Sequence, residues 1–176
     1  MKKILITCST AYGSSREYAE LLGEKLLLPV SDVTSSDISA SDSVIHFGSL
    51  YAGSVLGLRR VISKLPPSAS LVVVSVGIAD PSITVNADKI DGDIFRIIGE
   101  DFRKRTTTFH LRGRLDYSKL SAKHRAMMWM LCSFIKKKKE KTEEDMLILD
   151  TYGKRVDFFK PESIQPIAEY AIEMLS

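Results

Sequence analysis

Hydroxyl-bearing side chains gather near the start of the chain, between an apolar run at residues 4–6 and a helical apolar stripe over residues 18–26. Four of them flank Gly13: Ser9, Thr10, Ser14 and Ser15. Where a buried strand turns into a helix, the first amides of the helix and nearby hydroxyls converge, and this arrangement suits an anion. The stretch therefore predicts a phosphate site. The alternative is an ordinary serine-capped helix after a βα turn.

The kind of phosphate follows from what this stretch lacks. No lysine follows Gly13 as a P-loop requires, and no G-x-G-x-x-G run is present as in a dinucleotide fold, so ATP and NAD sites are disfavoured. Arg16 is the only cation close by in the sequence. A phosphate bound by hydroxyls and amides indicates a tightly held monophosphate rather than a triphosphate that is hydrolysed.

The elements that must position this loop alternate between strand and helix patterns. Apolar runs predict strands at residues 4–6, 28–33, 43–48, 71–76 and 107–111, and helical periodicity lies at residues 56–65, at 88–105 and after Pro161. This alternation implies an α/β protein with right-handed crossovers. We predict a three-layer sandwich whose five-stranded parallel sheet has the order 2-1-3-4-5, with Pro29 confining the second strand to an edge.

Three turns are expected to meet in this winding, because ligands bind beyond the carboxyl ends of strands 1 and 3. They are the hydroxyl-rich loop, the turn at residues 48–53 and the turn at residues 77–82. Tyr51 offers a flat ring for stacking, and Gly48 and Gly53 are expected to let the backbone approach a planar ligand. The alternative is a glycine-rich turn whose tyrosine only covers the start of a helix.

The spacing Thr10-x-x-Gly13-x-Ser15 resembles the phosphate loop of the flavodoxin family, which binds FMN. The resemblance implies an FMN site with the isoalloxazine ring between the second and third turns. The predicted cofactor-binding residues are Ser9, Thr10, Ala11, Tyr12, Gly13, Ser14, Ser15, Ser49, Leu50, Tyr51, Ala52, Gly53, Gly77 and Ile78. The third turn has no aromatic side chain, so one face of the ring is expected to be open, as a substrate-reducing enzyme needs.

Composition indicates a soluble protein with one domain over residues 1–176, since 44% of the residues are apolar and 27% are charged. The opening MKKILITCS fits a strand rather than a signal peptide, and no apolar run has membrane-spanning length. Cys8 and Cys132 have no metal or redox spacing, so reduced thiols and a cytoplasmic location are expected. Three scattered histidines indicate structural roles and no metal site: His46, His110 and His124. The net charge of +3 is too small to indicate nucleic acid.

Residues 112–141 form a basic and apolar insertion before the last strand and helix. A helix is expected from residue 122, almost apolar all round before it ends in the lysine run 136–139. Two interpretations stay open: a helix packed on the sheet edge with solvated charges, or a surface that meets a hydrophobic acidic molecule or an anionic membrane. In the second, the cations that pair with carboxylates are Arg112, Arg114, Lys119, Lys123 and Arg125. Residues 155–159 are expected to resume the outer strand.

The chain also resembles the flavodoxin-domain proteins grouped with menaquinone-dependent protoporphyrinogen dehydrogenase, in the segments SLYAG, GRLDYSKLSAKHRAMMWML, TEED and VDFF. This resemblance implies an FMN-dependent oxidoreductase that passes electrons from protoporphyrinogen to a quinone. The lysine run 136–139 separately allows peripheral contact with a membrane. Two alternatives stay open: a flavodoxin-type electron carrier, and a flavodoxin-like binding protein that lacks FMN. No catalytic acid or base carries over by motif, and the sequence does not indicate the oligomeric state.

Overall fold

The main sheet of the computed structural model, which describes residues 3–51 and 53–175, has five parallel strands in the order β2-β1-β3-β5-β6. They are β1 (Ile4–Ser9), β2 (Val30–Asp32), β3 (Ser43–Tyr51), β5 (Ser70–Gly77) and β6 (Thr106–Arg112). A short strand, β4 (Ser54–Val55), folds back antiparallel onto the end of β3. The predicted winding is confirmed, with β2 at an edge where Pro29 is tolerated.

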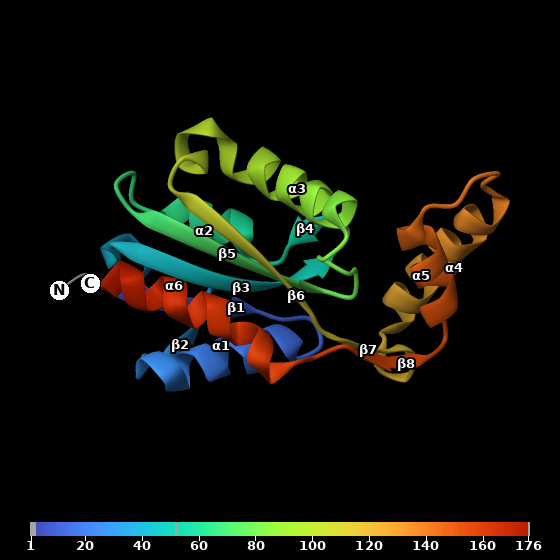
Figure 1. The fold of residues 1–176 in the computed structure, drawn as a ribbon, viewed down its shortest axis with the longest axis horizontal. Helices are drawn as coiled ribbons and strands as arrows, with labels where there is room; N and C mark the ends of the chain where they lie inside the picture. The colour runs from blue at the N-terminus through green and yellow to red at the C-terminus, as the bar shows by residue number, and fades with distance from the viewer. Residues whose placement is uncertain (1–2, 52, 176) are drawn as a thin grey trace.

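Helices cover both faces of the sheet (Figure 1). One face carries α1 (Ser14–Leu26) and α6 (Gln165–Leu175), and the other carries α2 (Leu58–Lys64) and α3 (Thr84–Arg103). In β5, Val72 and Val74 pack toward α1 and α6, whereas Leu71 and Val73 pack toward α2 and α3. Because β5 is buried on both faces, its sequence is a continuous apolar run. The three-layer sandwich is the predicted one.

The insertion leaves the sheet at Gly113 and forms an arm over residues 114–157. Its elements are β7 (Arg114–Asp116), α4 (Ala122–Lys137), α5 (Glu143–Thr151) and β8 (Arg155–Asp157). Figure 1 shows the arm extending from one end of the sandwich. Gly113 is required at the bend, because a Cβ there would lie 3.0 Å from both Ser14 Cβ and Val76 Cγ1.

The chain returns from the arm beside β7 rather than beside β6. β8 pairs antiparallel with β7 in a separate two-stranded sheet, so the prediction that residues 155–159 resume the outer strand is wrong. Side chains explain the docking: Arg114 Nε donates to Asp157 Oδ2 at 2.9 Å, and the Phe159 ring packs on Tyr18 with centroids 4.2 Å apart.

The arm has a small interior of its own, formed by Tyr117, Leu120, Cys132 and Ile135. Thr142 and Asp145 make a capping box at the start of α5, and Lys138 Nζ donates to both carboxylate oxygens of Asp145 at 2.9 Å. This bond lowers the Asp145 pKa and removes Lys138 from the solvated lysine run. α4 therefore packs on α5 and not on the sheet edge. No helix in residues 3–51 and 53–175 is long and apolar enough to cross a membrane.

Candidate functional site

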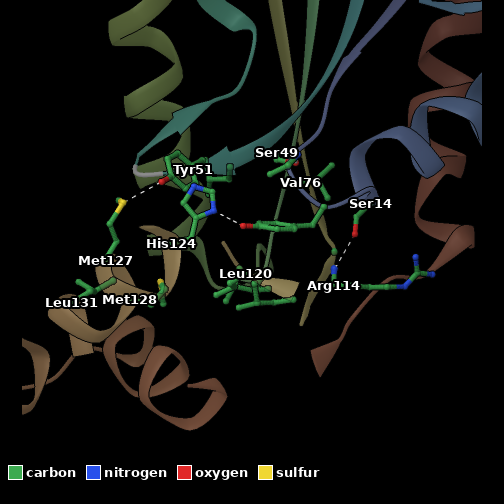
Figure 2. Close-up of a pocket in the computed structure, with 17 residues that line it drawn as sticks. Ser14, Ser49, Tyr51, Val76, Arg114, Leu120, His124, Met127, Met128 and Leu131 are labelled. Atoms are coloured by element: carbon green, nitrogen blue, oxygen red, sulfur yellow. Dashed lines mark hydrogen bonds between the residues drawn. The ribbon is translucent and has the colours of Figure 1, made fainter. Parts of the chain in front are cut away.

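The three turns and the arm enclose a pocket of about 460 Å³ at the carboxyl ends of β1, β3 and β5. The sandwich contributes Ala11, Tyr12, Ser14, Ser49, Leu50, Tyr51, Val76, Gly77 and Ile78. The bend and the arm contribute Gly113, Arg114, Leu115, Leu120, His124, Met127, Met128 and Leu131. Figure 2 shows Ser49 and Val76 on one side of this pocket and Leu120, Met128 and Leu131 on the other. The pocket is a mostly apolar chamber of ligand size.

The hydroxyl-rich loop leaves an open cradle at the start of α1. Gly13 caps the helix with a φ of 98° and provides no side-chain cap, and a Cβ on it would meet nothing nearer than Glu17 Oε1 at 4.0 Å. Thr10 Oγ1 accepts from the Gly13 amide at 2.8 Å, and Ser14 Oγ accepts from the Arg114 amide at 3.1 Å. A hydroxyl that accepts a backbone bond keeps its own proton for donation, so both serve as donors to an anion.

A second set of hydroxyl contacts fastens this loop to the turn after β3. Ser15 Oγ and Ser49 Oγ lie 2.9 Å apart, and Ser49 Oγ also accepts from the Ala11 amide at 3.1 Å. If Ser49 donates to Ser15, the Ser15 proton remains available for a ligand. These bonds join the cradle to the second turn.

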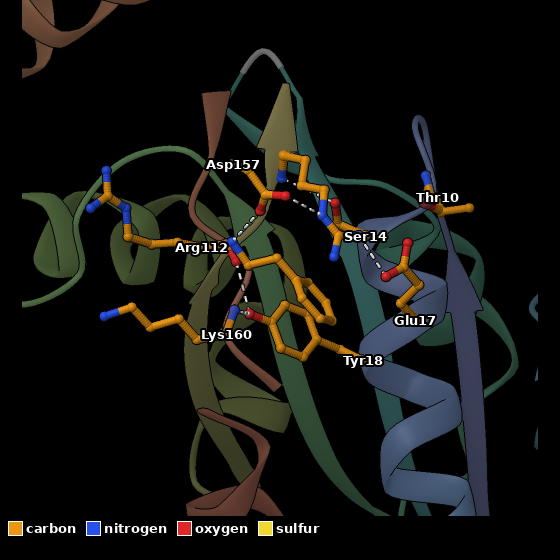
Figure 3. A network of polar contacts seen from close by, with 10 residues as sticks. Thr10, Ser14, Glu17, Tyr18, Arg112, Asp157 and Lys160 are labelled. Atoms are coloured by element: carbon orange, nitrogen blue, oxygen red, sulfur yellow. Dashed lines mark hydrogen bonds and ion pairs between the residues drawn. The ribbon is translucent and has the colours of Figure 1, made fainter. Parts of the chain in front are cut away.

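The cation beside the cradle is not the one expected from the sequence. Arg16 lies on the surface and pairs with Asp32 at 3.9 Å. The Arg114 amide donates to Ser14 Oγ, but the Arg114 guanidinium is held between Glu17 at 2.5 Å and Asp157 at 2.9 Å. Figure 3 shows both carboxylates, Glu17 and Asp157, near Ser14. The bond to Glu17 is the main cause that raises the Arg114 pKa. An anion in the cradle is thus met by amides and hydroxyls, as the monophosphate hypothesis requires.

The two glycines of the second turn both lie close to other parts of the protein. A Cβ on Gly48 would lie 2.3 Å from Val55 Cγ1, so this residue allows β4 to cross the end of β3. Gly53 has a φ of 72°, which a hairpin turn needs, and a Cβ on it would lie 3.3 Å from Asp93 Oδ2. The expectation that Gly48 admits a planar ligand is corrected accordingly, whereas for Gly53 it stays a prediction.

The third turn is held in place by Arg112. Its guanidinium donates to the Ile78 carbonyl at 3.0 and 3.2 Å and to Asp80 Oδ2 at 3.1 Å, and it lies 3.7 Å over the Phe158 ring. Arg112 and Arg114 are therefore occupied by protein partners, and their pairing with substrate carboxylates stays a prediction that would require these bonds to be exchanged. Their role is to position the third turn and the arm.

One face of α4 and the residues just before it form the far wall of the pocket. The residues on this face recur at helical spacing: Leu120, His124, Met127, Met128 and Leu131. The arm thus lies across the pocket from the third turn, where an open ring face is expected, and His124 lines this pocket. The helical spacing is visible in the sequence, but nothing local says that this face points at the three turns.

A comparison with protein families decides what kind of site this is. Residues 5–143 match the family model described as the flavodoxin domain. The chain belongs to the flavodoxin-domain family. No curated protein sequence matches it.

Solved structures with the same fold include several flavodoxins. One from Streptococcus pneumonia TIGR4 is 18% identical with a TM-score of 0.42, over 85% of this chain and 94% of its own. A short-chain flavodoxin associated with a non-canonical PDU bacterial microcompartment is 14% identical with a TM-score of 0.43, over 96% and 99%. A flavodoxin from the domain Archaea is 12% identical with a TM-score of 0.43, over 62% and 82%. Similarity at these levels concerns the fold.

FMN is the cofactor of this flavodoxin-domain protein, and the residues present fit it. The uncapped start of α1 and the donors Thr10, Ser14 and Ser15 suit the phosphate, and the apolar pocket beside Tyr51 suits the ring system. When bound, FMN supplies the redox chemistry, while the protein positions it and excludes water.

Most of the predicted cofactor-binding residues meet at this place. Eight of them line the pocket: Ala11, Tyr12, Ser14, Ser49, Leu50, Tyr51, Gly77 and Ile78. Thr10, Gly13 and Ser15 lie in the adjoining cradle. Ser9 instead faces Gly57, where a Cβ would lie 2.2 Å from its Oγ. Ala52 lies outside the described residues.

A fully buried histidine connects the second turn to the sheet. His46 Nδ1 accepts from the Thr7 hydroxyl at 2.9 Å, and Nε2 donates to the Leu56 carbonyl at 2.7 Å. Burial lowers the His46 pKa to about 4, so the ring is neutral at physiological pH. Since Leu56 follows β4, these bonds tie the hairpin that carries Tyr51 to the sheet.

Proposed function

We propose that the chain is an FMN-dependent oxidoreductase with a substrate chamber beside the flavin ring. The observation that carries this proposal is the apolar pocket of about 460 Å³ between the three turns and the arm, in which the ring would lie on the side of the turns and the substrate on the side of α4. A protein that only exchanges electrons through an exposed flavin edge has no need of such a chamber. The small net charge of +3 also differs from the strong charge that electrostatic docking of a carrier exploits.

The substrate class that we propose is a flat apolar redox molecule, a quinone as electron acceptor or a porphyrinogen as electron donor. The wall of leucine and methionine side chains on α4 suits such a molecule, because methionine adapts to irregular apolar shapes. For acidic groups on a substrate, exposed cations remain on the arm at Lys119, Lys123 and Arg125. The resemblance of the insertion to the protoporphyrinogen dehydrogenase group supports the same class.

The alternative function is an electron carrier without a substrate of its own, which family membership alone would equally support. Multiple turnover separates the two. The cofactor is first released from the purified protein and identified. The protein is then reloaded with FMN and mixed with a panel of quinones in the presence of a chemical reductant. We expect catalytic formation of quinol. If each quinone only oxidises the flavin once, at a rate that does not depend on the structure of the quinone, the electron-carrier function would be favoured.

We also propose that the arm touches an anionic membrane surface. Three large apolar side chains of α4 are more than half exposed, Trp129 at 63%, Met130 at 64% and Phe134 at 64%. The exposed lysines next to them are Lys136, Lys137 and Lys139. Apolar side chains flanked by lysines suit an interface with anionic lipids, where each lysine adds about 1 kcal/mol.

Sedimentation with vesicles of anionic lipid tests this contact. The variant replaces Lys136, Lys137 and Lys139 by Gln and keeps Lys138, because Lys138 holds the start of α5. A matched control replaces three exposed lysines of the sandwich: Lys25, Lys64 and Lys104. We expect the arm variant to lose most vesicle binding and the control to keep it. Equal loss of vesicle binding in both variants would show that the binding depends on net charge and not on the arm.

A further inference from the structure

His124, at the start of α4, is held between two tyrosines that come from different turns. Its Nδ1 is hydrogen-bonded to the Tyr12 hydroxyl, and its ring centroid lies 4.9 Å from that of Tyr51 and 5.9 Å from that of Tyr12. The Tyr51 hydroxyl in turn donates to Met127 Sδ at 3.2 Å. Figure 2 shows the imidazole at the pocket, close to Tyr51. The arm thus meets the flavin-binding turns through this ring.

The other ionisable groups that line the pocket in the described chain are Tyr12, Tyr51 and Arg114. Arg114 keeps its charge paired with two carboxylates, and the cations next to His124 on α4, Lys123 and Arg125, are exposed. Among these side-chain types, imidazole is the one that exchanges a proton near neutral pH. The pocket wall therefore contains a single group suited to general acid and base chemistry.

We propose that His124 is a catalytic residue that gives the bound acceptor one of the protons that accompany the electrons. This inference rests on the proposed function, with a quinone as acceptor. In the overall reaction, reduced FMN and the quinone give oxidised FMN and the quinol. The electron pair and one hydrogen come from reduced FMN. The Nε2–H bond of His124 breaks as an O–H bond of the quinol forms, and water receives the second proton of the reduced cofactor.

Tyr12 completes this role, because it connects the imidazole to solvent. Its side chain is 41% exposed, and its hydroxyl reaches Nδ1 of His124. Nδ1 takes the proton of that hydroxyl as Nε2 loses its own, and water restores the tyrosine. The hydrogen bond joins residues 112 positions apart, so the relay exists only when the arm is docked on the loop.

The deciding variant is His124→Gln, which keeps a polar side chain of similar length but cannot exchange a proton. Its control is Ala126→Gln, which adds the same side chain at an exposed position on α4. The first readout is the flavin midpoint potential over a pH series across neutrality, which does not depend on turnover. We expect the plot of potential against pH to bend in the wild type and in the control, and to lose this bend in His124→Gln.

The second readout is quinol formation at matched FMN content. We expect His124→Gln to lower the rate about 100-fold, the lower end of the usual contribution of general acid catalysis. Tyr12→Phe should keep the bend in potential and lower the rate less. An unchanged bend and rate in His124→Gln would overturn the inference alone. Absence of quinol formation by the wild type would overturn the proposed function, and the potential measurement would still decide whether His124 exchanges a proton with the flavin site.

Discussion

Thr10 Oγ1 accepts a hydrogen bond of 2.8 Å from the backbone amide of Gly13, three residues further along the chain. The bond closes the turn in which Gly13 adopts a φ of 98°, a conformation that L side chains rarely adopt. The shape of the phosphate cradle therefore depends on both residues. The hydroxyl also keeps a proton that it can donate, so we expect Thr10 to bind the phosphate besides shaping the turn.

Replacing Thr10 and Ser15 together by Ala should weaken FMN binding strongly. Each change removes a hydrogen bond to a charged group, worth about 1.5–3 kcal/mol, so each should raise the Kd by about 10-fold to 150-fold. Titration of the apoprotein with FMN measures the effect. The control is Thr10→Ser with Ser15→Thr, which keeps both hydroxyls and should stay near the wild type. A double Ala variant with wild-type affinity would exclude the cradle as the phosphate site.

Tyr51→Ala should weaken FMN binding by about 0.5–1.5 kcal/mol beyond the lost burial, because aromatic stacking is removed. The absorbance spectrum and the midpoint potential of the flavin should shift as well. Tyr51→Phe keeps the ring and removes only the hydroxyl that donates to Met127 Sδ, so its flavin properties should match the parent. If the Ala variant also matches the parent in spectrum and potential, Tyr51 does not contact the ring.

Arg112→Ala should destabilise the fold and loosen the third turn, because the Ile78 carbonyl and Asp80 lose their donor. We expect a loss of about 1–3 kcal/mol in the free energy of unfolding, measured by urea titration. Arg112→Lys should recover little, since an ammonium cannot replace the planar fork stacked on Phe158. An unchanged stability combined with a raised KM for an acidic substrate would instead restore the carboxylate-binding hypothesis.

The buried His46 should make stability depend on pH. Its pKa is about 4 in the folded protein and near the ordinary 6.5 when unfolded, so between these values the unfolded chain binds more protons. The stability contributed by the neutral ring is complete above pH 6.5 and is lost as pH falls toward 4. The loss should approach about 3 kcal/mol.

Urea unfolding of the wild type and of His46→Gln at a series of pH values isolates this effect, because carboxylate titration is common to both. The difference between the two stabilities should shrink as pH falls from 7 to 4.5. Parallel pH profiles would show that His46 does not titrate on unfolding. Glutamine can still donate to the Leu56 carbonyl, so the variant keeps that contact of the hairpin.

The sequence alone determined the winding of the sandwich and the nature of the loop. Both rest on short-range physics: apolar runs such as residues 71–76 form buried parallel strands, and right-handed crossovers leave few ways to order them. The loop needs only neighbours in sequence, since Thr10 bonds Gly13 and the helix start follows at once. The edge position of β2 followed in the same way from one proline.

The tertiary structure alone decided what surrounds the flavin site. Gly48 had the same local signature as a ligand-facing glycine, and only the crossing of β4 shows that Val55 fills its space. The sequence gives no sign that Arg112 and Arg114 have partners, because the carboxylates and the carbonyl that they contact are distant in the chain. His124 meets Tyr12 because Gly113 bends the chain out of the sheet and docks α4 across the pocket. Such contacts depend on where a whole arm comes to rest, and that position is set by the sum of many packing contacts rather than by any local pattern.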